Sequence, residues 1–598
     1  MRLPSPRPLS ELLSRARGPR RSDLLKRDAR HAVDKVLFLL ALVALSALVH
    51  EYGFRSDPLF LAAVDAAGPH IVGWFALLGT AKGLLADDRR HFVKTRRVDL
   101  VLFAVIGVHL ASGGHLADLL PGRATLSPDA VGQLYLVFTQ ALFAVAIVPG
   151  WIRYSKRLMG RSVQPGALIL ASFLLLTAVG TGLLLLPRAT RAGTIAPVDA
   201  LFTAASAASV TGLTVVDTAR TFTPLGKGIL LVLIQAGGLG IMTLTTVFAF
   251  LLAGGSTLRQ YAAMQSLVGE ESFGRLRATA AKIAFATLLF EGTGAAVLYR
   301  VLPEEALHGS GRLFSAVFVS VSAFCNAGFA LTPLNLAETS LAYDLPVLST
   351  VMVLVTAGGL GVPVLAGLAG LLARRERLSV HTKLVLVTSG ILVVLGTLGI
   401  AAIEASRSFA ALSPGRGLLA ALFLSVSSRT AGFNTVEMAA LSPATLFLVV
   451  FLMWVGGSPA STAGGVKTTT LALSVLNIHA IASGKNRIEL FRRQVSPLSV
   501  ARAFSTALLS FVVVGVALFA LLLVERAPFL DLLFEVISAV STVGLSTGVT
   551  PTLSWIGKLV VVALMLGGRV GLLGVVIALT PPARVTPHEY ASSDVLVT

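Results

Sequence analysis

The sequence contains little charge and almost no cysteine, and both shortages restrict the kind of protein it can be. Only 13% of its 598 residues are charged, against about 25% in ordinary soluble domains. In addition 55% are hydrophobic and the mean hydropathy is +0.82, which indicates a protein with many membrane spans. The single cysteine, Cys325, excludes an internal disulfide and a metal site built from several thiolates.

Acidic residues are scarce as well. The chain has 30 Asp and Glu against 49 Lys and Arg, which gives a net charge of +19, and its basic residues lie in blocks between apolar segments. Blocks in that position are typical of cytoplasmic loops rather than of a nucleic-acid surface. We therefore expect a cell-membrane protein that contacts lipid and no nucleic acid. The basic stretch 1–33 shows no apolar signal core in its first thirty residues and is predicted to be a cytoplasmic tail.

Apolar segments of nearly membrane-spanning length recur along the whole chain. A spanning helix needs about 20 mainly apolar residues. Four candidates lie near 36–49, 71–85, 100–110 and 134–151, and eight clearer ones near 166–186, 225–252, 280–300, 345–372, 384–404, 443–478, 503–524 and 555–579. The basic blocks at 87–97, 153–161, 373–383 and 484–494 follow even-numbered segments. This pattern predicts that both termini are cytoplasmic.

Short polar stretches that share one glycine position interrupt the apolar pattern between the last eight segments. They read "FTAASAASVTGLTVVDTA" (202–219), "FVSVSAFCNAGFALTP" (318–333), "LFLSVSSRTAGFNTVE" (422–437) and "FEVISAVSTVGLSTGVTP" (534–551). Their glycines are Gly212, Gly328, Gly432 and Gly544, and a glycine pair follows each of them, at Gly237/Gly238, Gly358/Gly359, Gly456/Gly457 and Gly567/Gly568. Two marks that recur in step predict four diverged copies of helix, re-entrant loop and helix.

The predicted fold is an all-α membrane protein with four pseudo-repeats around a central pore. We place the copies at 161–260, 261–380, 381–495 and 496–598, after about four accessory helices at 34–160. Non-helical backbone at membrane depth is tolerated only where it lines a cavity or is buried in protein. Four such strands can line a cation pore with carbonyls, and glycine allows both a positive φ and close approach. Small-residue helix packing is the more common explanation of one such loop alone, whereas four in register favour the pore.

Several of these motifs resemble the Trk/Ktr/HKT superfamily of potassium transporters. The similar strings are "SVTGLTVVDT" (209–218), "IQAGGLGIMTLTT" (234–246), "NAGF" (326–329), "RTAGFNT" (429–435), "GGSPASTAGGVKTTT" (456–470) and "STVGLSTG" (541–548). The resemblance implies potassium uptake through a K⁺-selective pore, a homodimer and, in many members, a cytosolic nucleotide-binding ring as regulator. In that family Gly at the first filter position accompanies K⁺ transport and Ser accompanies Na⁺ transport in some plant members. Gly212 therefore favours K⁺.

The resemblance also implies which residues bind the ion. The expected selectivity filter consists of Val210, Thr211 and Gly212; Asn326, Ala327 and Gly328; Thr430, Ala431 and Gly432; and Thr542, Val543 and Gly544. Because these strands differ from one another, we expect a filter less uniform than that of tetrameric K⁺ channels.

The stretch "WVGGSPASTAGGVKTTT" contains too many Gly, Pro, Ser and Thr residues for a regular apolar helix. It is either a kinked packing helix or, as the resemblance implies, an intramembrane loop that closes the pore below the filter. Arg569 lies near mid-membrane, where a lone cation costs about 2.5–3.5 kcal/mol and faces water or a polar partner. Either it binds a structural partner or snorkels, or it forms a cationic constriction. The expected gate comprises Gly456, Gly457, Ser458, Gly464, Gly465, Lys467 and Arg569.

Other function classes fit the sequence less well. No spacing of His, Asp, Glu or Ser indicates a metal site, a catalytic triad or paired carboxylates, so we expect neither an enzyme nor a cofactor. Glu291 and Glu404 are expected to be structural hydrogen-bond partners. A scaffold without transport leaves four costly polar loops unexplained. The nearest alternative is a Na⁺-permeable or K⁺/Na⁺-coupled transporter on the same fold.

Overall fold

The computed structural model describes residues 165–240 and 273–580, except residues 309, 374–376 and 486, and six single residues before residue 78. The chain divides into two compact units, 1–162 and 163–598, and the description below concerns the second. Apart from those six single residues, the predicted tail at 1–33, the predicted accessory helices at 34–160 and the C-terminal residues after 580 lie outside the described residues.

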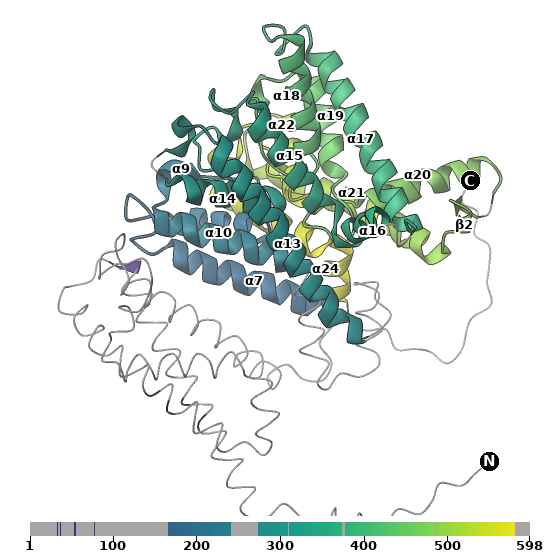
Figure 1. Cartoon of the computed structure of the whole chain (residues 1–598), viewed down its shortest axis with the longest axis horizontal. Coiled ribbons are helices and arrows are strands. Elements are labelled where there is room, and N and C mark those ends of the chain that lie inside the picture. Colours follow the sequence, from purple (N-terminus) through teal and green to yellow (C-terminus); the bar gives the residue numbers. More distant parts are fainter. Residues whose placement is uncertain are drawn as a thin grey trace, which may run out of the picture. The chain divides into compact units, whose positions relative to one another are not determined.

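The described part of the second unit is mostly helical, as predicted. Its main helices follow one another in four groups with the same order: a first helix, a short helix, an irregular turn and a second helix (Figure 1). The first helices are α7 (Pro165–Leu184), α13 (Phe273–Val301), α17 (Val380–Glu404) and α21 (Pro497–Val524). The short helices are α8 (Pro197–Ala208), α14 (Arg312–Phe324), α18 (Pro414–Ser427) and α22 (Phe529–Val540). The second helices are α10 (Pro224–Leu239), α15 (Leu345–Leu360), α19 (Pro443–Trp454) and α23 (Trp555–Val570).

Smaller elements connect these helices. Two of them follow a second helix after a single glycine: α16 (Val362–Leu372) and α24 (Leu572–Leu579). A third, α20 (Thr468–Ala482), follows α19 after the stretch 455–467. The others are α9 (Thr218–Thr221), η3 (Glu304–Leu307), η4 (Asn335–Ala337), η5 (Met438–Ala440), η6 (Thr550–Thr552) and a hairpin of β1 (Glu489–Leu490) with β2 (Arg493–Gln494).

The four groups are arranged in a closed ring. The second helix of each group packs against the short helix of the next group, in the pairs α10 with α14, α15 with α18, α19 with α22 and α23 with α8. Figure 1 shows the first of these pairs, with α10 beside α14. An ion pair between Lys558 of α23 and Asp199 of α8, 2.7 Å long, joins the last group to the first. The ring therefore closes between the beginning and the end of the described unit.

All four second helices begin with a side-chain cap. Thr223, Asp344, Ser442 and Ser554 each accept a hydrogen bond from a backbone N–H in the first turn. Glu404, at the end of α17, accepts from the backbone N–H of Ser442 at 3.0 Å and from its hydroxyl at 2.7 Å. The prediction that Glu404 is a structural hydrogen-bond partner is thus confirmed.

Two apolar segments predicted as single spans are broken helices. The segment 345–372 turns by 105° between α15 and α16 at Gly361, and 555–579 is divided into α23 and α24 at Gly571. Both glycines have positive φ, 81° and 89°, a conformation that no residue adopts within an α-helix. Hydropathy could not locate the breaks, because apolar residues continue on both sides. Among the described residues, α17 and α21 alone are long and apolar enough to cross a membrane as single helices.

The repeated glycine pair allows the second helices to approach the short helices closely. In three groups, a Cβ atom on one glycine of the pair would overlap a carbonyl oxygen in the last turn of the short helix. The distances are 2.0 Å from Gly237 to Ala208, 1.9 Å from Gly358 to Phe324 and 1.9 Å from Gly568 to Val540. These glycines therefore fix the position of the short helices, whose carbonyl ends lead into the irregular turns.

We expect Gly568→Ala to destabilise the protein by about 1–3 kcal/mol or more, because the new methyl group must displace the Val540 carbonyl of α22. The neighbouring substitution Gly567→Ala is the control, since its methyl group would meet nothing within 4 Å. Thermal unfolding of the purified protein in detergent measures both effects. Equal Tm values for the two variants would contradict the close packing.

Candidate functional site

The four irregular turns that follow the short helices have the same backbone conformation. The residue two positions before each repeat glycine is left-handed, with φ of 56° at Val210, 59° at Asn326, 73° at Thr430 and 51° at Thr542. The glycines Gly212, Gly328, Gly432 and Gly544 also have positive φ, from 67° to 99°. A left-handed β-branched residue is a genuine outlier, and strained positions of this kind persist only where the surroundings determine them. The shared strain marks these turns as the candidate site.

The four glycines lie together in one ring. A Cβ atom on each would overlap the carbonyl oxygen of the residue that precedes the glycine in the next group. The distances are 2.5 Å from Gly212 to Ala327, 2.9 Å from Gly328 to Ala431, 2.4 Å from Gly432 to Val543 and 2.2 Å from Gly544 to Thr211. The structure thus brings together the twelve residues that the sequence nominated as a filter, in the order of the chain. All four carbonyl-bearing residues are fully buried.

Serine hydroxyls in the short helices hold the turns, and the sequence analysis did not identify them. Ser206 accepts a hydrogen bond from the Gly212 N–H, and Ser538 accepts one from the Gly544 N–H, both at 3.1 Å. In the other two groups Ser322 and Ser427 donate instead to the carbonyl after the glycine, at Phe329 and Phe433. A serine six residues before the glycine in three of the four stretches was the signal that could have revealed them.

The third turn is one residue shorter than the others. In the first, second and fourth groups the backbone N–H before the glycine bonds the carbonyl five residues earlier, as from Val543 to Ser538. In the third group the Ala431 N–H bonds the Ser427 carbonyl four residues earlier. The ring is therefore a set of four similar strands rather than four identical ones.

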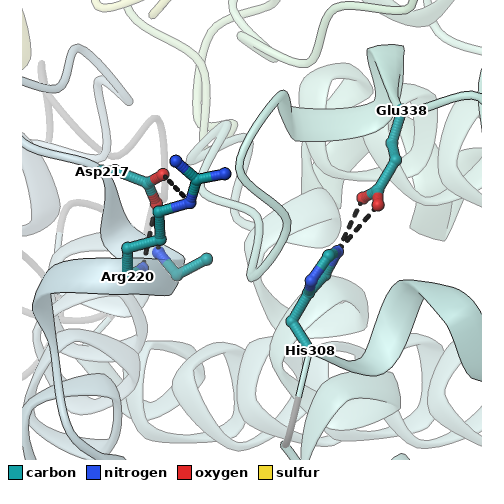
Figure 2. Close-up of polar contacts among 5 residues, drawn as sticks. Asp217, Arg220, His308 and Glu338 are labelled. Atoms are coloured by element: carbon teal, nitrogen blue, oxygen red, sulfur yellow. Dashed lines mark hydrogen bonds and ion pairs between the residues drawn. The ribbon is translucent and has the colours of Figure 1, made fainter.

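The segments that follow the glycines are each supported by different side chains. After the first turn, Asp217 caps α9 and lies 3.6 Å from the Arg220 guanidinium (Figure 2). After the fourth turn, Ser546 and Thr550 both donate to the buried carboxylate of Glu535 in α22, the Thr550 bond being 2.6 Å. Sequence reasoning did not identify Glu535. The corresponding positions in the other short helices are Thr203, Val319 and Leu424, so no repeat pattern drew attention to it.

The glycine-rich stretch at 455–467 forms a loop between α19 and α20, as one of the two interpretations predicted. A Cβ atom on Gly456 would overlap the Gly464 carbonyl at 2.0 Å, so this loop carbonyl occupies the place that a short-helix carbonyl has in the other groups. Thr462 donates from its N–H to Gly358 and from its hydroxyl to the Phe324 carbonyl, both at 3.2 Å. The loop therefore contacts the second group next to its turn.

The loop also lies against the fourth group, close to the ring. A Cβ atom on Gly464 would be 2.1 Å from the hydroxyl oxygen of Thr542, one of the predicted filter residues. Within the loop, Lys467 donates to the Ala463 carbonyl at 2.7 Å. The predicted gate residues from Gly456 to Lys467 are thus brought together beside the fourth turn.

Arg569 joins three of the four groups. It is 2% exposed, and its guanidinium donates to the Gly237 carbonyl of α10 at 2.9 Å and to the Thr462 carbonyl of the loop. Its partners are backbone carbonyls rather than a carboxylate, so it retains its positive charge next to the loop. Arg569 both attaches the loop to α10 and α23 and carries the charge that the sequence placed at a constriction.

Glu291 of α13 is buried and contacts residues of α10 and of the end of α14. Its carboxylate accepts from the Gln235 amide at 3.1 Å and from the Cys325 thiol at 3.6 Å. The prediction that Glu291 is a structural hydrogen-bond partner is confirmed.

The ring geometry predicts that alanine substitution has different effects at Gly544 and Gly548, which both have a positive φ. Gly544→Ala should lower both stability and transport, because the methyl group would overlap the Thr211 carbonyl. Gly548→Ala is the matched control: its φ is 97°, against 99° at Gly544, but its methyl group would meet nothing within 4 Å. We expect Gly548→Ala to cost only the left-handed strain, about 1–2 kcal/mol, and to conduct normally. Thermal unfolding and ion flux in proteoliposomes test this, and equal loss of flux in both variants would contradict the ring.

Known proteins are similar to this chain in sequence and in fold. The chain is 37% identical over 449 residues to the Ktr system potassium uptake protein B of Vibrio alginolyticus, covering 74% of this chain and 96% of that protein. It is 35% identical to the Ktr system potassium uptake protein D of Bacillus subtilis (69% and 92% covered) and 36% identical to the potassium/sodium uptake protein NtpJ of Enterococcus hirae (73% and 97%).

A solved structure supports the fold, and a family model supports the resemblance seen in the motifs. The crystal structure of the potassium transporter TrkH from Vibrio parahaemolyticus matches with a TM-score of 0.58 at 19% identity, covering 81% of this chain and 98% of that one. The family model described as TrkH, cation transport protein, matches residues 136–585. This transport family agrees with the prediction that the protein is not an enzyme. The chain belongs to the TrkH family of cation transport proteins.

Proposed function

We propose that this chain forms a K⁺-selective pore through which potassium is taken up across the cell membrane, driven inward by the membrane potential. The observation that carries the proposal is the ring of Gly212, Gly328, Gly432 and Gly544, in which four strained backbone strands approach within contact distance. Carbonyl oxygens at such a ring can replace the hydration shell of a cation. The ions bind to the backbone of the twelve filter residues, from Val210–Gly212 to Thr542–Gly544, and no cofactor takes part.

The choice of K⁺ rests on ligand chemistry and on relatives. The twelve residues are uncharged, so the ligands are neutral carbonyls rather than the carboxylate rings found in many other cation channels. Two of the relatives are named potassium uptake proteins. A Na⁺-permeable or K⁺/Na⁺-coupled transporter is the second candidate, favoured by the relative named a potassium/sodium uptake protein.

The gate is formed by the loop 455–467 together with Arg569. The loop lies against the filter residue Thr542, and Arg569 attaches it to α10 through the Gly237 carbonyl. A cation that leaves the filter meets a glycine-rich backbone that can move aside and a fixed positive charge. Opening requires the bonds from Arg569 to Thr462 and from Thr462 to Gly358 to break together.

Proposals on the assembly, the orientation and the regulator of the protein rest on the family and on the charge pattern. We propose that the protein is a homodimer in lipid, with both termini in the cytoplasm, and that a cytosolic nucleotide-binding ring regulates it. The residues 34–160 are accessory helices, and the four repeats occupy 161–260, 261–380, 381–495 and 496–598. The outer mouth of the pore lies on the side of the segments that follow the repeat glycines.

The function is tested by growth of a host that lacks K⁺ uptake. The wild-type chain should restore growth at low K⁺, and Gly212→Ser should raise Na⁺ permeability relative to K⁺, because a side chain at this position displaces the Ala327 carbonyl of the neighbouring strand. Reversal potentials in mixed K⁺ and Na⁺ solutions measure the ratio. Failure of the wild type to restore growth would contradict the proposed K⁺ uptake. Unchanged reversal potentials in the folded Gly212→Ser variant would contradict the filter assignment.

The gate is tested by freeing the loop. Deletion of residues 458–463, or Arg569→Ala, should raise K⁺ flux without a regulator while the K⁺/Na⁺ ratio stays nearly fixed, since none of the deleted or substituted residues is one of the twelve filter residues. The two changes together should be less than additive, because either one releases the same contact. Arg569→Lys separates charge from attachment: it keeps the charge but has a single ammonium group in place of a guanidinium that reaches two carbonyls. A small rise in flux is expected for Arg569→Lys, and no rise in any folded variant would place the gate elsewhere.

A further inference from the structure

The second repeat differs from the others in how its filter strand is supported. In the part of the chain that the structure describes, Gly328 is the one proposed filter residue whose carbonyl accepts a hydrogen bond from a side chain. The donor is the Asn335 amide, at 2.9 Å. Asn335 is half-buried and lies seven residues after the glycine, at the start of η4. The Gly328 carbonyl therefore accepts a hydrogen bond from the segment that follows the second turn.

The orientation of the Asn335 amide is fixed at both ends. Its oxygen accepts from the Leu336 backbone N–H at 2.9 Å, and because an N–H can only donate, the amide nitrogen must face Gly328. The residue itself is left-handed, with φ of 57°, a conformation that Asn adopts more readily than most residues. Its own carbonyl accepts from the Thr332 hydroxyl. Three separate features thus hold one amide against one filter carbonyl.

The segment that carries Asn335 is anchored to the rest of the second repeat. Glu338 follows η4 directly, and its carboxylate oxygens lie 2.8 and 2.9 Å from the imidazole Nε2 of His308 (Figure 2). His308 is in the connection between α13 and α14, so the pair ties the post-filter segment to that connection. The carbonyl of Glu338 also accepts from the N–H groups of Leu341 and Ala342, both at 2.8 Å. Asn335 is consequently a rigid support rather than a mobile loop side chain.

A hydrogen-bond donor changes what the Gly328 carbonyl offers to a cation. The amide N–H places partial positive charge beside the oxygen and so weakens the field that a bound ion experiences. The same bond limits how far the carbonyl can turn towards a smaller ion. Weaker, less mobile ligands penalise Na⁺ more than K⁺, because Na⁺ loses more hydration energy when it enters the filter. The other three strands carry no such donor among the described residues.

We propose that Asn335 is a specificity-determining residue, which fixes and weakens the Gly328 carbonyl and thereby favours K⁺ over Na⁺. This inference rests on the proposed filter. Asn335→Gly removes the donor and keeps the left-handed backbone, and we expect the Na⁺/K⁺ permeability ratio to rise about fivefold, as for the loss of one hydrogen bond. Asn335→Asp, which also accepts this backbone and replaces the donor by a negative charge, should raise the ratio further.

The control is Asn434→Asp. Asn434 also follows a repeat glycine, but its amide bonds the Val436 carbonyl at 3.2 Å rather than a filter carbonyl. This variant adds the same negative charge after the third turn but removes no hydrogen bond to a filter carbonyl. The Na⁺/K⁺ permeability ratio is therefore expected to change less than twofold. Flux of ⁸⁶Rb⁺ and ²²Na⁺ into proteoliposomes of full-length protein, together with size-exclusion profiles, gives the ratio for folded material.

The outcomes separate this inference from the filter itself. If both Asn335 variants keep the parental ratio while Gly212→Ser shifts it, Asn335 has no role in specificity and the filter stands. If Gly212→Ser leaves the ratio unchanged as well, the filter assignment fails. An equal shift in Asn434→Asp and Asn335→Asp, with none in Asn335→Gly, would assign the effect to charge at the mouth and overturn the proposal.

Discussion

The close approach of four backbone strands at the glycine ring is the constraint on which the rest of the structure depends. Each ring glycine lies where a methyl group would overlap the carbonyl oxygen of the neighbouring strand. The residue two positions before each glycine is left-handed, a conformation that costs about 1–3 kcal/mol. Such strain persists only under firm support. Serine hydroxyls such as Ser206 and Ser538 hold the strands, and the glycine pairs of α10, α15 and α23 hold the carbonyl ends of the short helices. The apolar helices around them position these contacts.

The third repeat shows how the same architecture yields the loop that we propose as the gate. Its turn is one residue shorter, and its second helix ends at Trp454 instead of continuing along the short helix. The carbonyl of Gly464, from the loop, then fills the position against Gly456 that a short-helix carbonyl fills in the other groups. A short-helix carbonyl belongs to a regular element, whereas Gly464 belongs to a loop attached by a few hydrogen bonds. One contact of the common packing scheme has thus been transferred from a helix to a loop.

The sequence predicted the repeats and the candidate ring because both leave periodic marks. Glycines that recur in step with the apolar segments predicted the four loops, and the resemblance to the potassium-transporter superfamily nominated the twelve residues of the turns, which the structure brings together. The helix breaks at Gly361 and Gly571 were missed, because hydropathy carries no information on backbone direction when apolar residues continue on both sides of a break. Glu535 and Asn335 were missed for a different reason. Each occurs in one repeat only and acts on residues up to fifteen positions away, so no period or local motif reveals it.

The differences among the repeats have a consequence for how specificity is set. In a pore made of four identical chains, any substitution alters all four ligands of a ring at once. In the filter that we propose here, a substitution alters a single strand, so a bound ion would lose or gain the contribution of one ligand in four. The Gly328 carbonyl with its amide donor, the Thr542 strand against the loop and the Glu535 carboxylate behind the fourth turn are separate single-strand features. As the proposed filter, such a ring would change its ion preference in small steps while its other strands preserve the fold.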